Sequence, residues 1–173
     1  MRYVGSKNKL SKDLIPIIQS YITSDTKGYI EPFVGGGNMI DKIQCSNKIG
    51  CDIHEELIEL LKYAQEFSSL IPERILKEQY IEVKNNKDKY EKWYVGLVGF
   101  CASFGAKYFG GYARDSRDDN SGKWSAGAIR NLKKQSPNLH NIKFINSSFM
   151  DLPIDNLKNY VIYCDIPYKG TTK

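Results

Sequence analysis

The chain lacks the residue patterns that mark several common classes of protein. Its four cysteines contain no Cys-x-x-Cys pair, and two histidines are too few to complete a conventional zinc site with them. No apolar run is long enough to span a membrane, and the first five residues do not have the pattern of a secretory signal peptide. We therefore expect no metal centre and a reducing, cytoplasmic setting.

The glycine turn from Gly35 to Gly37 lacks the residues that bind phosphates in known motifs. A P-loop requires Lys-Ser/Thr after its last glycine, and Asn38 and Met39 stand there instead. A dinucleotide fingerprint requires glycine or alanine three residues after Gly37, where this chain has Ile40. A pyrophosphate ligand is therefore disfavoured. A plain structural turn, and a turn that approaches a cofactor with an adenosine but no phosphate, both stay open.

What the chain does contain is typical of one soluble globular domain. Its 173 residues are 41% hydrophobic and 26% charged, and there are no internal repeats or low-complexity stretches. The net charge of +5 is compatible with a nucleic-acid partner but does not require one.

Four apolar runs predict the strands of a sheet, at residues 28–34, 48–53, 142–146 and 160–164. Each run is followed by glycine or polar residues, and in open α/β sheets ligands bind beyond the carboxyl ends of the strands. Cys51 and Cys164 lie inside two of these runs, so we expect both to be buried, inert thiols.

Two strand ends carry an aspartate whose chemistry suggests a binding site. Asp52 follows the glycine turn at close to the spacing of about 20 residues at which an acidic residue commonly binds a ribose, although it could also cap the next helix. Asp165, Pro167 and Tyr168 together offer a hydrogen-bond acceptor, a fixed backbone and a flat face. These three would suit a planar substrate with an amino group, or they could form a simple turn.

Apolar periodicity predicts helices over residues 11–22, 55–67, 72–83, 90–104 and 124–139. Ser11 is the expected N-cap of the first helix. The buried face of that helix is predicted to consist of Leu10, Leu14, Ile17, Ile18, Tyr21 and Ile22. The 90–104 helix is predicted to bury one bulky face that extends from Trp93 to Phe104.

Between the second and third strands, the predicted helices flank a glycine-aromatic-basic loop at residues 105–114. Basic residues outnumber acidic ones from Arg114 to Lys134. Aromatic side chains mixed with Arg and Lys suit contacts to phosphates and extruded bases, although a helical cap with a solvated face would have the same composition. The candidates for DNA contact are Lys107, Tyr108, Arg114, Arg117 and Arg130.

Four motifs, in their order along the chain, closely resemble those of the Dam-like group of adenine-specific DNA methyltransferases. They are Tyr3-x-Gly5-Ser6-Lys7, Glu31-Pro32-Phe33-Val34-Gly35-Gly36-Gly37, Asp52 and Asp165-x-Pro167-Tyr168. The resemblance implies an α/β, Rossmann-like methyltransferase sheet with a mostly helical target-recognition insert. It divides the chain into a cofactor-binding part (1–67), the insert (68–140) and a return to the catalytic sheet (141–173).

The resemblance also implies S-adenosylmethionine as the methyl donor and double-stranded DNA with a flipped-out adenine as the substrate. Asp52 would bind the ribose of the cofactor, the glycine turn its methionine end, and Tyr3 and Phe149 its adenine. The full set of implied cofactor contacts is Tyr3, Lys7, Pro32, Phe33, Gly35, Gly37, Asn38, Asp52, Phe149 and Asp165.

In the implied catalytic motif, two acceptors would hold the amine of the target adenine. They are the carboxylate of Asp165 and the backbone carbonyl of Ile166. Pro167 would fix the backbone, and Tyr168 would stack on the base.

Two features depart from the family pattern. The family has proline where this chain has Ile166, so we expect reduced rather than abolished activity. Four strands are visible where the family has seven. The rest would follow residue 173, and the chain is expected to be a fragment or a truncated remnant whose exposed sheet edge could form a dimer. The alternatives are a remnant that binds S-adenosylmethionine or DNA without methylating it, and a methyltransferase that acts on RNA or protein glutamine.

Overall fold

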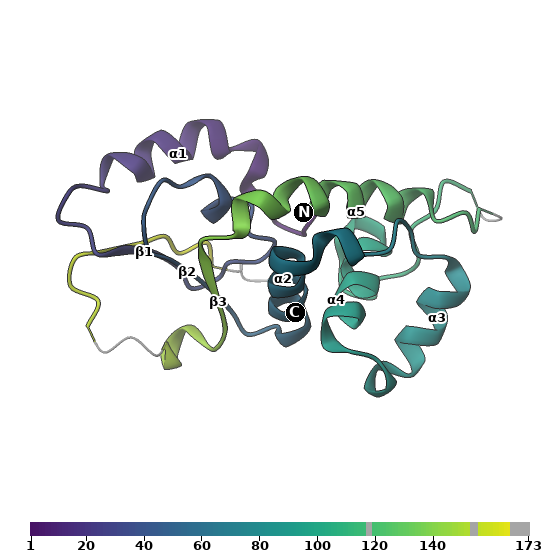
Figure 1. Cartoon of the computed structure of the whole chain (residues 1–173). Helices are drawn as coiled ribbons and strands as arrows, with labels where there is room; N and C mark the ends of the chain where they lie inside the picture. The colour runs from purple at the N-terminus through teal and green to yellow at the C-terminus, as the bar shows by residue number, and fades with distance from the viewer. Residues whose placement is uncertain (117–118, 153–155, 167–173) are drawn as a thin grey trace.

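The computed structural model describes residues 1–116, 119–152 and 156–166. These residues contain a parallel sheet of four strands: β1 (Gly28–Glu31), β2 (Lys48–Asp52), β3 (Ile142–Asn146) and β4 (Tyr160–Ile162). The order across the sheet is β3-β2-β1-β4, and all neighbouring strands are parallel. Figure 1 labels β1, β2 and β3, which lie side by side. The four predicted strands are therefore confirmed, and their carboxyl ends meet at one edge of the sheet.

Three strands end earlier than predicted, and β2 does so by one residue, at Asp52. β1 stops at Glu31 because Pro32 has no N–H to donate to the ladder. β4 spans three residues and pairs with β1 on one side only among the described strands. The prediction that Cys164 is buried is wrong, because the chain has left this edge strand and Cys164 is exposed, whereas Cys51 on β2 is fully buried as predicted.

Five α-helices accompany the sheet in the described part of the chain: α1 (Ser11–Ser20), α2 (Glu55–Phe67), α3 (Lys77–Asn85), α4 (Lys92–Cys101) and α5 (Lys123–Gln135). α2 has the predicted bounds, and the other helices are shorter than predicted. The predicted start of α3 at Pro72 is wrong, because Gln79 accepts a hydrogen bond from the N–H of Leu76 (2.8 Å) and the helix begins at Lys77. A 3-10 turn, Ser136–Leu139, follows α5.

α1 differs from the sequence prediction at its start and on its apolar face. The N-cap is Leu10, and Ser11 is the first helical residue, whose hydroxyl donates to the carbonyl of Asn8 (2.8 Å). Of the six apolar side chains expected to be buried, only Ile18 is, whereas Ile17 is 57% exposed and Leu10 and Tyr21 are also exposed. The helix therefore contacts the core through a narrow stripe, which periodicity alone could not distinguish from a broad face.

α4 is buried on every side rather than on one face. Each residue from Val95 to Cys101 is buried, because α4 packs against α2, α3 and α5. A Cβ on Gly96 would lie 2.1 Å from the carbonyl oxygen of Glu56 on α2, so the two helix backbones are in direct contact. Phe104, predicted to extend the buried face, lies instead in the 3-10 turn Phe104–Ala106 and is exposed.

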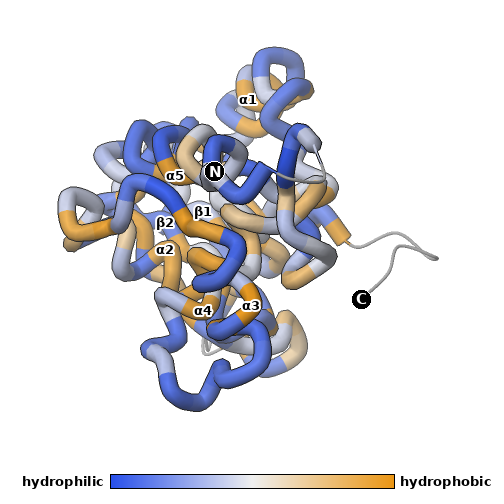
Figure 2. The backbone as a smooth tube through the Cα atoms, turned by 90° about the vertical axis from the view of Figure 1, so that its right-hand side faces the viewer, coloured by the Kyte–Doolittle hydropathy of each residue, from blue (hydrophilic) through white to orange (hydrophobic). Residues whose placement is uncertain are grey.

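The main hydrophobic core is continuous from the sheet into the helices. It joins Tyr29 of β1 and Phe144 of β3 to Leu60 of α2, Leu97 of α4 and Ile129 of α5. Figure 2 shows hydrophobic residues (orange) along α2, α3 and α4 and hydrophilic residues (blue) on the outer turns. Within the three described stretches, none of the helices has the length and apolar content needed to cross a membrane.

Candidate functional site

The glycine turn and Asp52 are held together at the carboxyl edge of the sheet. The turn follows β1 and contains Gly35 (φ +49°) and Gly37 (φ +67°), both in the left-handed region that favours glycine. The N–H of Gly35 donates to Oδ2 of Asp52 (3.1 Å). Asp52 thus fixes the position of the turn across two neighbouring strands.

Asp52 is a largely buried carboxylate that still has capacity for further hydrogen bonds. Its Oδ1 accepts from the N–H of His54 (3.0 Å), and burial raises the pKa of its carboxyl. Because two carboxylate oxygens offer about four acceptor sites, the two bonds with Gly35 and His54 leave room for a ligand hydroxyl. The alternative that Asp52 caps α2 is wrong, since His54 occupies the N-cap position.

Exposed apolar side chains follow β2 and β3 next to this carboxylate. Ile53, the residue after Asp52, is 75% exposed, and Phe149, which follows β3, is 53% exposed. The ring of Phe149 contacts that of Phe33 after β1, with centroids 5.3 Å apart. The N–H of Ser147 donates to the carbonyl of Asp52 (3.1 Å) and holds the segment after β3 close to β2. The edge therefore offers flat apolar surface beside a hydrogen-bonding acid.

Two side chains from the N-terminal segment complete this edge. The ring of Tyr3 lies so close to the glycine turn that a Cβ on Gly35 would be 2.7 Å from it. Burial, and then the nearby charge of Asp52, raise the pKa of the Tyr3 hydroxyl. The Nζ of Lys7 lies 2.7 Å and 2.8 Å from the two carboxylate oxygens of Asp165.

Asp165 lies three residues after the end of β4, at the same edge as Asp52 and the turn. Its side chain is partly buried, and the neighbouring Ile166 is 58% exposed. Pro167 and Tyr168, the other two residues of the predicted catalytic motif, lie outside the described residues. The structure thus brings the glycine turn, Asp52 and Asp165 to one edge of the sheet, and Lys7 contacts Asp165 there.

Two further residues support the site: Gln135, which the sequence did not reveal, and Glu31, which the sequence marked only as part of a motif. The Nε2 of Gln135, at the end of α5, donates to the carbonyls of Gly36 (3.1 Å) and Gly37 (3.0 Å). The carboxyl of Glu31, at the end of β1, accepts a hydrogen bond from the hydroxyl of Tyr29 (2.8 Å), and burial raises its pKa to about 8. Gln135 carries no sequence signal, whereas an acid inside an apolar strand is a usable one.

The remaining predicted cofactor residues are Pro32 and Asn38, and both are buried. The Nδ2 of Asn38 has no hydrogen-bond partner within the described stretches. The same stretches contain no group of three His, Cys, Asp or Glu side chains placed to hold a metal ion.

The predicted DNA-contacting residues differ in exposure. Lys107, Arg114 and Arg130 are exposed, and Arg117 lies outside the described residues. Tyr108 is partly buried: its hydroxyl donates to Oε1 of Glu56 (3.2 Å), and its ring packs edge-on against that of His54 with centroids 4.4 Å apart. Tyr108 therefore connects the 105–114 loop to the start of α2.

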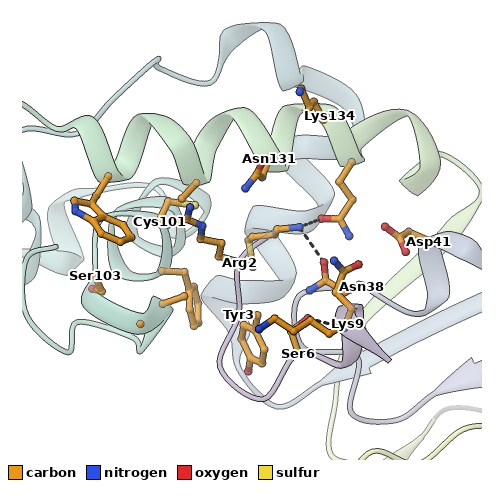
Figure 3. Close-up of a pocket in the computed structure, with 18 of the residues that line it drawn as sticks. Arg2, Tyr3, Ser6, Lys9, Asn38, Asp41, Cys101, Ser103, Asn131 and Lys134 are labelled. Atoms are coloured by element: carbon orange, nitrogen blue, oxygen red, sulfur yellow. Dashed lines mark hydrogen bonds between the residues drawn. The ribbon is translucent and has the colours of Figure 1, made fainter. Parts of the chain in front are cut away.

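A pocket of about 620 Å³ lies between α5, α4 and the N-terminal segment. Figure 3 shows Asn131 and Lys134 on α5 above it and Arg2, Ser6 and Lys9 on the segment. The acidic Asp41, which also lines it, is paired with Lys42 (2.8 Å). The pocket therefore has a basic rim, formed by Arg2, Lys9 and Lys134, which the sequence analysis did not single out.

The family model of the D12 class N6 adenine-specific DNA methyltransferases matches residues 3–173. The search of curated proteins finds none that matches the chain.

Proposed function

The chain belongs to the D12 class N6 adenine-specific DNA methyltransferase family, and from this we propose how its residues bind cofactor, adenine and DNA. The activity of the family is methylation of the exocyclic amine of adenine in DNA, which disfavours the alternatives of an RNA or a glutamine substrate. The observation that carries the residue assignments is the convergence of the glycine turn, Asp52 and Asp165 at one edge of the sheet.

We propose that S-adenosylmethionine binds at this edge, and the residues present fit it. Asp52 has acceptor capacity left for the ribose hydroxyls, and the exposed faces of Ile53 and Phe149 suit an adenine ring. The glycine turn brings bare backbone to the methionine end. When bound, the cofactor supplies a methyl group on a positively charged sulfur.

Asp165 and the carbonyl of Ile166 are proposed to hold the target amine. The amine of adenine is a weak nucleophile because its lone pair is delocalised into the ring. Two acceptors that hold both amine hydrogens localise that lone pair in the direction of the methyl group. The backbone carbonyl at 166 is available whatever the side chain, so Ile166 preserves the acceptor and removes only the fixed φ of proline.

The proposed DNA surface combines the predicted insert residues with the basic rim of the pocket. Arg2 and Lys9 belong to the same short segment as Lys7, so a duplex on this rim would lie beside Asp165. The adenine would have to leave the DNA helix to reach the carboxylate, and unstacking and unpairing it costs about a few kcal/mol. A 2-aminopurine at the target position would report this step as an increase in fluorescence on binding, and unchanged fluorescence would contradict it.

The cofactor and amine assignments are tested with two isosteric variants and a control. Asp52→Asn should weaken S-adenosylmethionine binding by about tenfold or more, as expected for loss of a hydrogen bond to a charged group. Asp165→Asn should retain cofactor affinity and lower kcat by about a hundredfold. Asp25→Asn, at an exposed acid before β1, should change neither.

The measurements are calorimetric titration of the cofactor and mass-spectrometric detection of N6-methyladenine in duplex DNA. Methyl transfer to RNA or to protein glutamine but not to duplex DNA would contradict the proposed substrate. Unchanged cofactor affinity in Asp52→Asn would contradict the proposed site.

The DNA surface is tested by salt dependence. Arg2→Ala, Lys9→Ala and Lys134→Ala should each weaken DNA binding and reduce the slope of log K against log salt by about one. Lys27→Ala is the matched control, because Lys27 is exposed but lies before β1, at the opposite ends of the strands. If the slope of log K against log salt is unchanged in all three variants, DNA does not bind at this basic rim.

The open side of β4 is a proposed dimer contact. β4 has no neighbour on that side among the described strands, and Ile162 is partly exposed there. Light scattering of the purified chain at increasing concentration should show a dimer, and Ile162→Lys should abolish it. A monomer at all concentrations would refute this contact.

A further inference from the structure

Lys7 places its ammonium on the one carboxylate that the proposed reaction needs. Its Nζ is within hydrogen-bond distance of both oxygens of Asp165, at 2.7 Å and 2.8 Å, and also donates to the carbonyl of Gly5 (3.2 Å). The pair is partly buried, with 17% of the Lys7 side chain and 25% of the Asp165 side chain exposed. Exposed ion pairs are commonly weak, but this one is shielded and joins residues from two separate segments.

The backbone around Lys7 is fixed by local hydrogen bonds. Lys7 is the first residue of a 3-10 turn, Lys7–Lys9, and the hydroxyl of Ser6 accepts from the N–H of Asn8 (3.3 Å). The N–H of Leu10 donates to the carbonyl of Lys7 (2.8 Å). The ammonium is therefore presented to Asp165 from an ordered turn rather than from a free chain.

In the observed arrangement Lys7 contacts both oxygens of Asp165, so the target amine would share an oxygen with it. A carboxylate has about four acceptor sites, so both partners can be held at once, and the amine gains an oxygen of its own if Lys7 moves to a single oxygen. Glu31, at the end of β1, also faces Asp165, and burial raises its pKa to about 8, so at neutral pH it adds little negative charge.

We infer that Lys7 is a positioning residue that shares Asp165 with the target amine: it keeps one carboxylate oxygen and yields the other when adenine enters. This inference rests on the proposed role of Asp165. Lys7 thereby holds the carboxylate in one orientation, so that one of its oxygens can accept a hydrogen bond from the amine. Lys7 acts through Asp165, whereas the family resemblance implies a contact between Lys7 and the cofactor.

The test compares Lys7→Met, which removes the charge, with Lys7→Arg, which retains it, and with Lys12→Met as a control. Lys12 is an exposed residue of α1 in the next turn of the chain. Lys7→Met should lower kcat by about tenfold or more. The Kd for S-adenosylmethionine should stay within about threefold of wild type, which is below the loss expected for one hydrogen bond. Lys7→Arg should recover part of kcat, and Lys12→Met should match wild type.

The split between kcat and cofactor affinity, together with the partial rescue by Lys7→Arg, separates this role from a merely structural one. An unchanged kcat, or a loss confined to cofactor affinity, would overturn the inference.

A wild-type chain that transfers no methyl group would be a failure of the proposed function and not of this inference. In that case the 13C signal of the Asp165 carboxyl is compared in wild type, Lys7→Met and Lys12→Met at one pH. A signal displaced in Lys7→Met but not in Lys12→Met supports the pair, and identical signals in all three refute it.

Discussion

Replacing Gly35 by alanine should disturb the proposed cofactor site through Tyr3. Gly35 has φ +49°, and an alanine in this left-handed conformation costs about 1–2 kcal/mol. In addition, the new Cβ would lie 2.7 Å from the ring of Tyr3, and such overpacking costs about 1–3 kcal/mol. The two effects together predict a loss of about 2–5 kcal/mol in the free energy of unfolding.

Gly105→Ala is the matched control, because it has the strain without the contact. Gly105 has φ +63°, and no atom lies within 4 Å of the position that a Cβ would take there. Its replacement should lose only about 1–2 kcal/mol. Urea unfolding followed by circular dichroism measures both variants, and the difference between them isolates the contact with Tyr3.

A double-mutant cycle with Tyr3→Ala tests the contact between residue 35 and the ring of Tyr3. In that background, Gly35→Ala should lose no more than Gly105→Ala, because the ring that the Cβ meets is gone. In the wild-type background, Gly35→Ala should also weaken S-adenosylmethionine binding by about tenfold or more, since the turn must shift. Equal losses for Gly35→Ala and Gly105→Ala, or no coupling with Tyr3, would show that Tyr3 does not pack on the turn.

Three further predictions follow from other contacts. The pKa of Glu31 is raised from 4.5 to about 8, so the unfolded chain releases this proton at a lower pH than the folded protein does. The free energy of unfolding should therefore fall as pH rises from 4.5 to about 8, by up to about 1.4 kcal/mol per pH unit. Glu31→Gln should remove this slope in urea titrations, and a slope that persists would have to come from other groups. Gly96→Ala should lower the free energy of unfolding by about 3 kcal/mol, because the new Cβ meets the backbone of α2. Gly127→Ala on α5, which has open space around it, should raise the free energy of unfolding by about 0.5–1 kcal/mol. Similar values for the two variants would argue against the close approach of α2 and α4. Ile166→Pro should raise kcat by about two- to fivefold, because the fixed φ of proline reduces the entropy cost of ordering the motif by about 0.4–1 kcal/mol. Unchanged methyl transfer in this variant would count against this role of residue 166.

The strands and the residues that follow them were predictable, although not the exact strand ends, because they depend on local pattern. Apolar runs that stop at glycine or aspartate placed the turn, Asp52 and Asp165 at strand ends, and parallel pairing then brings all three to one edge. The resemblance to adenine-specific DNA methyltransferases is confirmed by the family match. Assignment of individual residues to cofactor, amine and DNA stays a prediction.

The contacts that support the site could not be predicted because they join distant residues. Gln135 bonds to the carbonyl of Gly37 from 98 residues away, and nothing in the sequence of α5 distinguishes it from a solvated glutamine. Likewise, periodicity could not reveal that α4 is buried all round or that α1 contacts the core only narrowly. Both depend on how many neighbours a helix has, which is a property of the packed molecule.

The ion pair of Lys7 and Asp165 also has a consequence for how the protein folds. The two residues are 158 positions apart, so the contact closes nearly the longest loop that the described chain allows. The glycine turn, β2 and α2 can associate early, whereas β4 must add to β1 before Asp165 can reach Lys7. Contacts of such high sequence separation form slowly. During synthesis the proposed cofactor-binding elements should therefore be assembled well before the molecule can act on a base, and catalytic competence should be the last property that the folding chain acquires.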